Sequence, residues 1–126
     1  NLRPQMYKLK DLDKADKARV EKLRGPAFWK YLAKKANQEG AHYCAGSAFK
    51  GEQKSFLGPK KSYYQLADDD PIGCCPKNSH PDGGWVIYKS GTTSYESDGS
   101  AAYKKALDQL TNDEAGGDAS DEVKPD

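Results

Sequence analysis

Apolar positions in the first forty residues repeat at helical spacing. Asp11 or Asp13 offers a side chain that can cap the start of a first helix, and Gly25 marks its end. Pro26 then opens a second helix that runs to about Gln38, because glycine favours the end of a helix and proline its first position. The apolar stripe of the first helix consists of Leu9, Leu12, Ala15, Val20 and Leu23.

The second predicted helix separates an aromatic and aliphatic face from a basic one. A face of this kind is most simply the core side of a helix, with the lysines in solvent. An anion-binding stripe is the alternative interpretation of the same lysines. The apolar face holds Phe28, Trp29, Leu32, Ala33 and Ala36, and the basic residues are Lys30, Lys34 and Lys35.

After the helices, the pattern becomes irregular over residues 41–84, where only 62–66 alternates as a strand would. Residues 85–89 and 93–97 predict a β-hairpin around a Ser-Gly turn. A short helix over about 100–111 follows, capped by a serine.

These segments predict a small single α+β domain. It comprises an N-terminal helical pair, an irregular cysteine-stapled loop region, one β-hairpin and a short C-terminal helix. We place the domain at residues 11–111, between a basic N-terminal extension over 1–10 and an acidic disordered tail over 112–126. A chain of 126 residues with 36% apolar side chains has room for one modest core.

Charge is distributed unevenly along the chain although the total is only +1. Residues 1–65 carry fifteen Lys/Arg and six Asp/Glu, a net charge of about +9, whereas residues 66–126 carry five and thirteen, about −8. Such blocks bear on binding partners rather than on the fold. An alternative is that the acidic half docks on the basic half within the monomer.

The three cysteines predict a covalent staple across the irregular region. Since neighbouring cysteines rarely bond to each other, we expect a disulfide from Cys44 to either Cys74 or Cys75, with one thiol left over. Three reduced thiols and a metal or covalent cofactor are the alternatives. The bridge and the start at Asn1 predict a processed chain in an organelle lumen, a periplasm or the extracellular space.

Catalytic and metal motifs are weak. His42 and His80 join the cysteines as zinc ligand types, but neither a Cys-x2-Cys nor a His-x3-His spacing is present. The acids at 68–70 lack the arrangement of a calcium loop, and a Cys75–His80 pair is the best nucleophile candidate. The sequence also lacks phosphate and dinucleotide fingerprints, so we predict no enzyme activity, no metal and no cofactor.

Function is therefore predicted from surface chemistry. We expect a non-catalytic accessory or structural subunit that binds and stabilises a larger protein complex through its basic half and extended loops. No apolar run is long enough for a membrane span. The residues expected to contact the partner are Trp29, Lys30, Lys34, Lys60, Lys61, Tyr63, Tyr64 and Trp85.

A nucleic-acid-binding module is the alternative function. Lysines and tyrosines alternate through residues 30–64, which suits phosphate contact and base stacking. Against it, the chain has only three arginines, the residue type favoured for bidentate phosphate or base contacts.

Overall fold

The computed structural model describes residues 3–38, 41–44 and 54–116 and confirms a small α+β domain. Within these described residues, four α-helices combine with two small antiparallel sheets and two single turns of 3-10 helix. The helices are α1 (Arg3–Lys8), α2 (Lys14–Lys22), α3 (Pro26–Lys35) and α4 (Ala101–Gln109), and the 3-10 turns are η1 (Leu9–Asp11) and η3 (Tyr63–Gln65). The strands are β1 (Gly58–Pro59), β2 (Pro71–Cys74), β3 (Gly83–Tyr88), β4 (Thr93–Ser97) and β5 (Leu110–Thr111).

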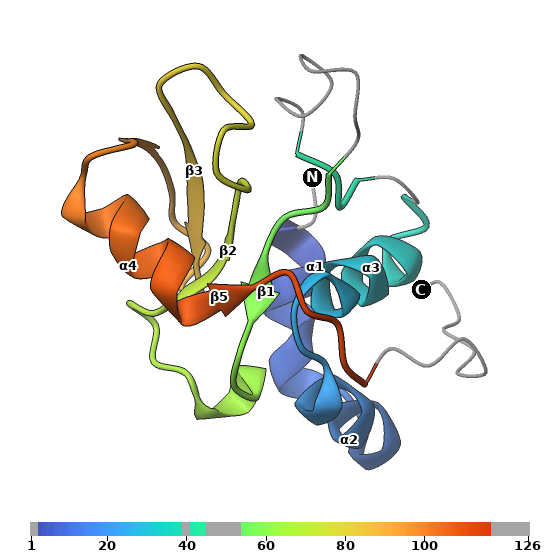
Figure 1. Cartoon of the computed structure of the whole chain (residues 1–126). Coiled ribbons are helices and arrows are strands. Elements are labelled where there is room, and N and C mark those ends of the chain that lie inside the picture. Colours follow the sequence, from blue (N-terminus) through green and yellow to red (C-terminus); the bar gives the residue numbers. More distant parts are fainter. Residues whose placement is uncertain (1–2, 39–40, 45–53, 117–126) are drawn as a thin grey trace.

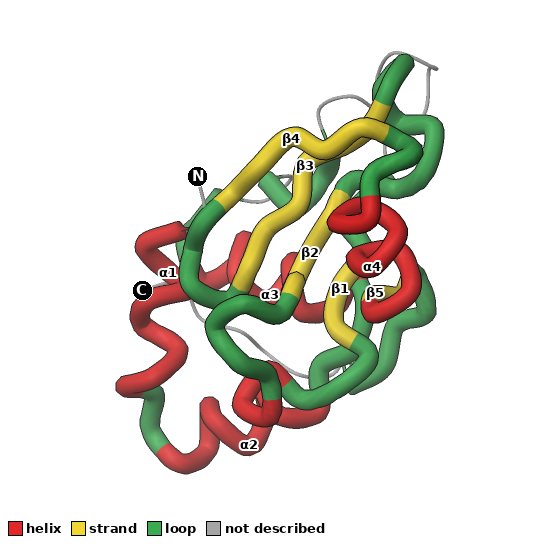
Figure 2. The backbone as a smooth tube through the Cα atoms, turned by 90° about the vertical axis from the view of Figure 1, so that its left-hand side faces the viewer, coloured by secondary structure: helices red, strands yellow, loops and turns green. Residues whose placement is uncertain are grey.

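The sheets lie between two groups of helices. Strands β2, β3 and β4 form one antiparallel sheet in that order, and β1 pairs with β5 in the other. Helices α1 and α3 lie on one side of the strands and α4 lies on the other (Figure 1). An isolated bridge between Leu57 and Cys74 connects the chain leading into β1 with the end of β2, so the two sheets lie next to each other (Figure 2).

Side chains of β3 alternate between two apolar clusters. Val86 is fully buried with Cys74, Tyr103 and Ala106 on the α4 side, whereas Ile87 packs against the cluster built on α1 and α3. This period of two is what an extended strand requires when both of its faces are covered.

Trp29 of α3 is the centre of the larger cluster. Its side chain is 1% exposed, and its indole Nε1 donates to the backbone oxygens of Leu57 and Ile72, each at 3.1 Å. The ring lies so close to β2 that a Cβ on Gly73 would stand 2.4 Å from the Trp29 ring. Helix α3 is therefore fixed to both sheets through one side chain.

The helix boundaries follow the sequence signals. The Asp13 side chain accepts from the Asp16 backbone N–H at 2.8 Å and caps α2, and Ser100 caps α4 in the same way. Gly25 has φ of 63°, and a Cβ there would lie 2.3 Å from the Asp113 backbone oxygen. Glycine is thus needed directly before Pro26, both for the dihedral angle and for the close approach.

Three local expectations are corrected. Residues 62–66, expected as a strand, contain the 3-10 turn η3, because Tyr63 turns inward to stack on Phe28 at 5.5 Å. The basic lead-in contains α1, since Pro4 lies in the first turn, where its missing N–H costs nothing. Strands β1, β2 and β5 have only two to four residues each, too short to leave a periodic signal.

The ends of the described chain contact the domain. Met6 and Leu9, within or beside the proposed N-terminal extension, are buried in the larger cluster. Residues 112–116 of the proposed tail lie beside the helices through a bridge between Arg24 and Ala115, while 117–126 lie outside the described residues. Within the described ranges, every helix is too short or too polar to cross a membrane.

Replacing Trp29 with Phe should destabilise the domain by about 2–4 kcal/mol, because it removes ring volume and the indole donor to one buried and one partly buried carbonyl. Trp85→Phe is the matched control, since Trp85 is 44% exposed and should cost less than about 0.5 kcal/mol. Urea unfolding of the two variants compares them directly. Equal losses would show that Trp29 is not the link between helix and sheets.

Candidate functional site

The two neighbouring cysteines serve different parts of the molecule. Cys74 ends β2 and faces α4, where it belongs to the smaller apolar cluster. Cys75 follows directly after β2, its N–H donates to the Trp85 backbone oxygen at 3.0 Å, and its sulfur lies 3.4 Å from the Trp85 backbone nitrogen. Of the two neighbours, Cys75 is the one whose sulfur contacts the Cys44 sulfur.

Cys44, Cys75 and His80 converge on one point. The two sulfur atoms are 2.9 Å apart, and His80 Nε2 lies 3.4 Å from the Cys44 sulfur and 3.3 Å from the Cys75 sulfur. Both cysteines are buried and the histidine is partly exposed. Within the described ranges this is the one group of three metal-ligating side chains whose donor atoms come so close together.

The thiols of this region are held in their neutral form. The hydrogen bond with Cys44 and burial raise the pKa of Cys75, while the Trp85 N–H, 3.4 Å from its sulfur, acts in the opposite direction. Burial raises the pKa of Cys74 to about 12. None of the three cysteines forms a disulfide in the structure, so the expected bridge is present as proximity between Cys44 and Cys75 and not as a bond.

An exposed aromatic pair lies next to this cluster. Trp85 of β3 and Tyr95 of β4 are cross-strand partners whose rings meet edge to face at 5.4 Å, and they remain 44% and 41% exposed. The His80 ring lies 5.6 Å from Tyr95. Tyr95 donates to the Asp82 carboxylate at 2.6 Å, and this hydrogen bond is the main reason that the pKa of Tyr95 is raised to about 12.

The aromatic residues expected at a partner contact are divided between core and surface. Trp29 and Tyr63 are 1% and 2% exposed, so neither offers a ring to a partner. Tyr64 is half-buried, and its hydroxyl donates to the Leu9 oxygen at 2.8 Å. Trp85 alone of the four lies at the surface.

The expected lysines are near the surface but are not gathered at one place. Lys34 is exposed on α3, whereas Lys30 pairs with Glu114 at 2.5 Å. That ion pair joins the basic and acidic halves of the chain. This ion pair supports the interpretation that the acidic half docks on the basic half within the monomer. Exposed ion pairs of this kind contribute little to stability.

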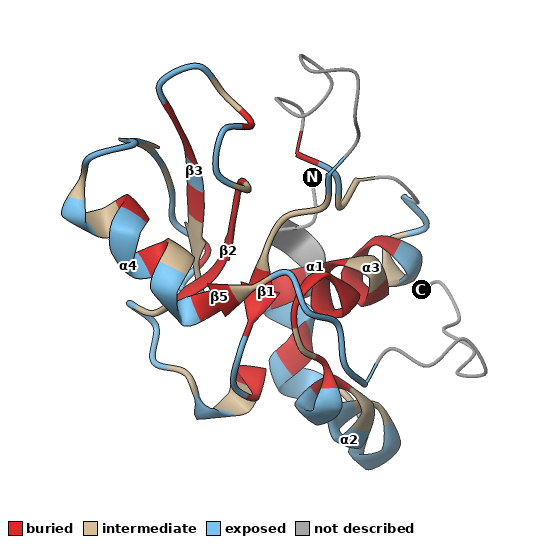
Figure 3. Cartoon of the chain, viewed as in Figure 1, coloured by how far each residue is buried: buried red, intermediate tan, exposed pale blue. Residues whose placement is uncertain are grey.

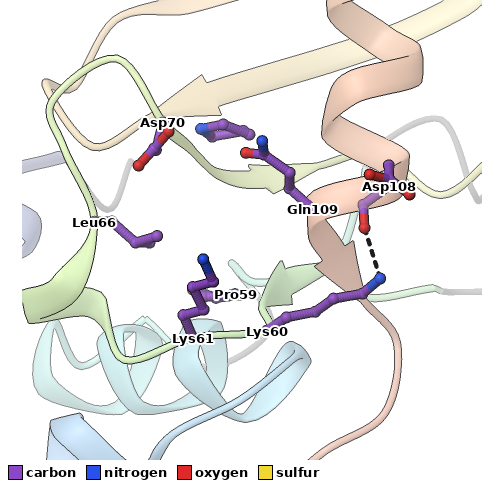
Figure 4. A pocket seen from close by; sticks show the side chains of 8 residues that line it. Pro59, Lys60, Lys61, Leu66, Asp70, Asp108 and Gln109 are labelled. Atoms are coloured by element: carbon purple, nitrogen blue, oxygen red, sulfur yellow. Dashed lines mark hydrogen bonds between the residues drawn. The ribbon is translucent and has the colours of Figure 1, made fainter.

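Lys60 and Lys61 line a pocket of about 230 Å³ (Figure 4). The Lys60 ammonium donates to the Asp108 backbone oxygen at 2.6 Å, and the Lys61 side chain extends into the space beside Leu66 and Gln109. Asp70 lines the same pocket, so the lysines do not make it a purely cationic site. The remaining lining residues are Pro59 and Pro71.

From the sequence, Cys44 is predicted to meet Cys74 or Cys75 and His80 is a zinc ligand type, but Tyr95 is not placed beside Trp85 or linked to Asp82. The predicted hairpin held the needed signal for Tyr95, because a short turn around Ser90-Gly91 places residues 85 and 95 opposite each other. Comparison with family models, curated proteins and solved structures finds no match to this chain.

Replacing Asp82 with Asn should lower the pKa of Tyr95 from about 12 toward its ordinary value near 10, because the tyrosinate would no longer face a carboxylate. A pH titration of the Tyr95 ring resonances by NMR measures this shift. Asp98→Asn is the control and should move the pKa much less, since it acts only through space. An unchanged pKa in Asp82→Asn would contradict the hydrogen bond.

Proposed function

We propose that this protein is a non-catalytic accessory subunit that binds a larger protein assembly. The observation that supports it is the aromatic pair Trp85–Tyr95, two large rings held in fixed register at the surface of the sheet. Tryptophan and tyrosine dominate the binding energy of protein interfaces because they bury much area at little entropic cost.

The polar groups beside the pair suggest the chemistry of the partner. Asp82 accepts from Tyr95, and its backbone oxygen accepts from the N–H of Asp98 at 2.9 Å, so two exposed carboxylates belong to this corner of the fold. A partner surface with an apolar patch flanked by Lys or Arg would complement it. The lysine-rich outer face of α2, exposed in Figure 3, supplies a second surface of opposite charge.

The state of the thiols supports a binding role over catalysis. The Cys75 sulfur lies 3.3 Å from His80 Nε2, a distance that would suit a nucleophile and its general base. A nucleophilic cysteine, however, requires a lowered pKa and access to substrate. The Cys75 side chain is buried and its pKa is raised. A buried thiol with a raised pKa lacks the activation that a catalytic nucleophile needs.

Nucleic-acid binding has less support among the described residues. Base stacking needs exposed rings, and Tyr63 is buried against Phe28. Part of the lysine- and tyrosine-rich segment 30–64 lies outside the described residues, namely 39–40 and 45–53. Protein binding is therefore the function we put forward, and release by nuclease would indicate the other.

We include in the proposal a disulfide between Cys44 and Cys75 in an oxidising compartment, such as an organelle lumen, the periplasm or the extracellular space. Closing the 2.9 Å gap between the sulfurs requires a movement of about 0.9 Å toward bonding distance. The bridge would span 31 positions and stabilise the domain by roughly 3 kcal/mol in the chain-entropy description.

Trp85→Ala and Tyr95→Ala should each reduce recovery of the partner by at least about tenfold when the tagged chain is used as bait in a gentle extract, because each truncates a central interface ring. Tyr7→Ala is the control, since Tyr7 is 56% exposed and not part of the pair. Size exclusion with mass spectrometry identifies the partner. Elution of the wild-type chain alone, near 14 kDa, would reject the proposal.

Oxidation of the purified chain with glutathione disulfide should join Cys44 to Cys75 with a mass loss of about 2 Da, as two thiol hydrogens are transferred to the oxidant. Peptide mapping without reductant locates the bridge. Cys74→Ser should keep it, because Cys74 faces α4, and Cys75→Ser should lose it. A Cys44–Cys74 bridge in the wild-type chain would contradict the contact between the Cys44 and Cys75 sulfurs.

A further inference from the structure

The thiol cluster consists of Cys44, Cys75 and His80, and a disulfide would use only the two cysteines. A bridge between Cys44 and Cys75 would consume both sulfurs and leave the third side chain without a role. Yet His80 Nε2 is nearly equidistant from the two sulfur atoms, at 3.4 and 3.3 Å. Three soft or borderline donors around one point form the ligand set of a thiophilic metal ion.

We propose that, in the reduced chain, Cys44, Cys75 and His80 bind one zinc ion through two thiolates and Nε2. Solvent fills the fourth tetrahedral position. On binding, two sulfur–zinc bonds and one nitrogen–zinc bond form, and two thiol protons leave to solvent, with no change in oxidation state. Two thiolates balance the charge of Zn²⁺, so the complex is neutral and suits a buried position.

The observed distances are close to those of such a site. With Zn–S bonds of about 2.3 Å and a Zn–N bond of about 2.05 Å, tetrahedral angles place sulfur and nitrogen about 3.5 Å apart. The two observed values, 3.4 and 3.3 Å, need little change. The two sulfurs, now 2.9 Å apart, must separate by roughly 0.8 Å to reach the tetrahedral spacing.

The backbone around the site allows this adjustment on one side. Cys75 is tied to β3 by the hydrogen bond from its N–H to the Trp85 oxygen, and its sulfur also accepts from the Trp85 N–H. Cys44 lies outside the three-stranded sheet. Its backbone N–H donates to the Lys54 backbone oxygen at 2.8 Å. We therefore expect Cys75 to act as the fixed ligand and Cys44 to move.

Metal and disulfide are competing states of the same sulfur pair. A bound zinc ion holds both sulfurs as ligands, so it should slow the reaction of the pair with an external disulfide. This competition gives the proposal a second readout that does not depend on spectroscopy of the metal. The proposal is also independent of the protein-binding function, since the aromatic pair needs no metal.

Cobalt(II) titration of the full, reduced chain without oxygen is the first test. Co²⁺ should give the intense visible bands of four-coordinate geometry and thiolate-to-cobalt charge transfer, saturating at one equivalent, and Zn²⁺ should displace it. Zinc should also slow disulfide formation by glutathione disulfide by at least about tenfold. A reduced, folded chain that shows no saturable spectrum, or no protection, would overturn the proposal.

Three variants assign the ligands, and two more serve as controls. Cys44→Ser and Cys75→Ser should each remove much of the charge-transfer band, and His80→Gln should weaken cobalt affinity by at least about tenfold. Cys74→Ala and His42→Gln are the matched controls and should bind as the wild-type chain does. If the serine variants fail to fold, His80→Gln still decides, because His80 is only partly buried. Wild-type affinity in His80→Gln would overturn the assignment.

Discussion

The structure depends on the hydrogen bonds of a single indole. Trp29 Nε1 donates to the oxygens of Leu57, which leads into β1, and Ile72, which lies in β2. The hydrogen bond to Ile72 is buried and the one to Leu57 is partly buried, and an unpaired buried carbonyl costs about 1–3 kcal/mol. The strands are short and aliphatic side chains are few. The packing of α3 on the sheets therefore depends largely on Trp29 and on Gly73, which leaves room for its ring.

The candidate site lies at the end of the strand that Trp29 contacts. Trp29 donates to the Ile72 oxygen in β2, and β2 ends at Cys74, directly before Cys75. Cys74 completes the apolar cluster under α4, and Cys75 contacts Cys44 and His80. The register of β3 and β4 places Trp85 and Tyr95 opposite each other, and both remain exposed. The core, the thiol cluster and the aromatic pair therefore all adjoin the three-stranded sheet.

The sequence predicted elements whose signals are local. Asp13, Gly25, Pro26 and Ser100 mark helix ends through their own side chains or dihedral angles, and the hairpin shows as alternation. Long-range features were not predictable in this way. Nothing in the neighbourhood of Tyr63 says that it stacks on Phe28, and the choice between Cys74 and Cys75 depends on the long-range contact between the Cys44 and Cys75 sulfurs.

The boundary between helices and sheets shows how little the opposite charge blocks of the two halves contribute to the fold. If the halves were held together mainly by opposite charge, ion pairs would fill the boundary between helices and sheets. The boundary is instead occupied by Trp29, Phe28, Ile72 and Ile87, and the Lys30–Glu114 pair lies at the exposed margin. An apolar boundary is insensitive to salt, whereas exposed charges act over about a Debye length in solution. The blocks are therefore better placed to select a partner than to hold the fold.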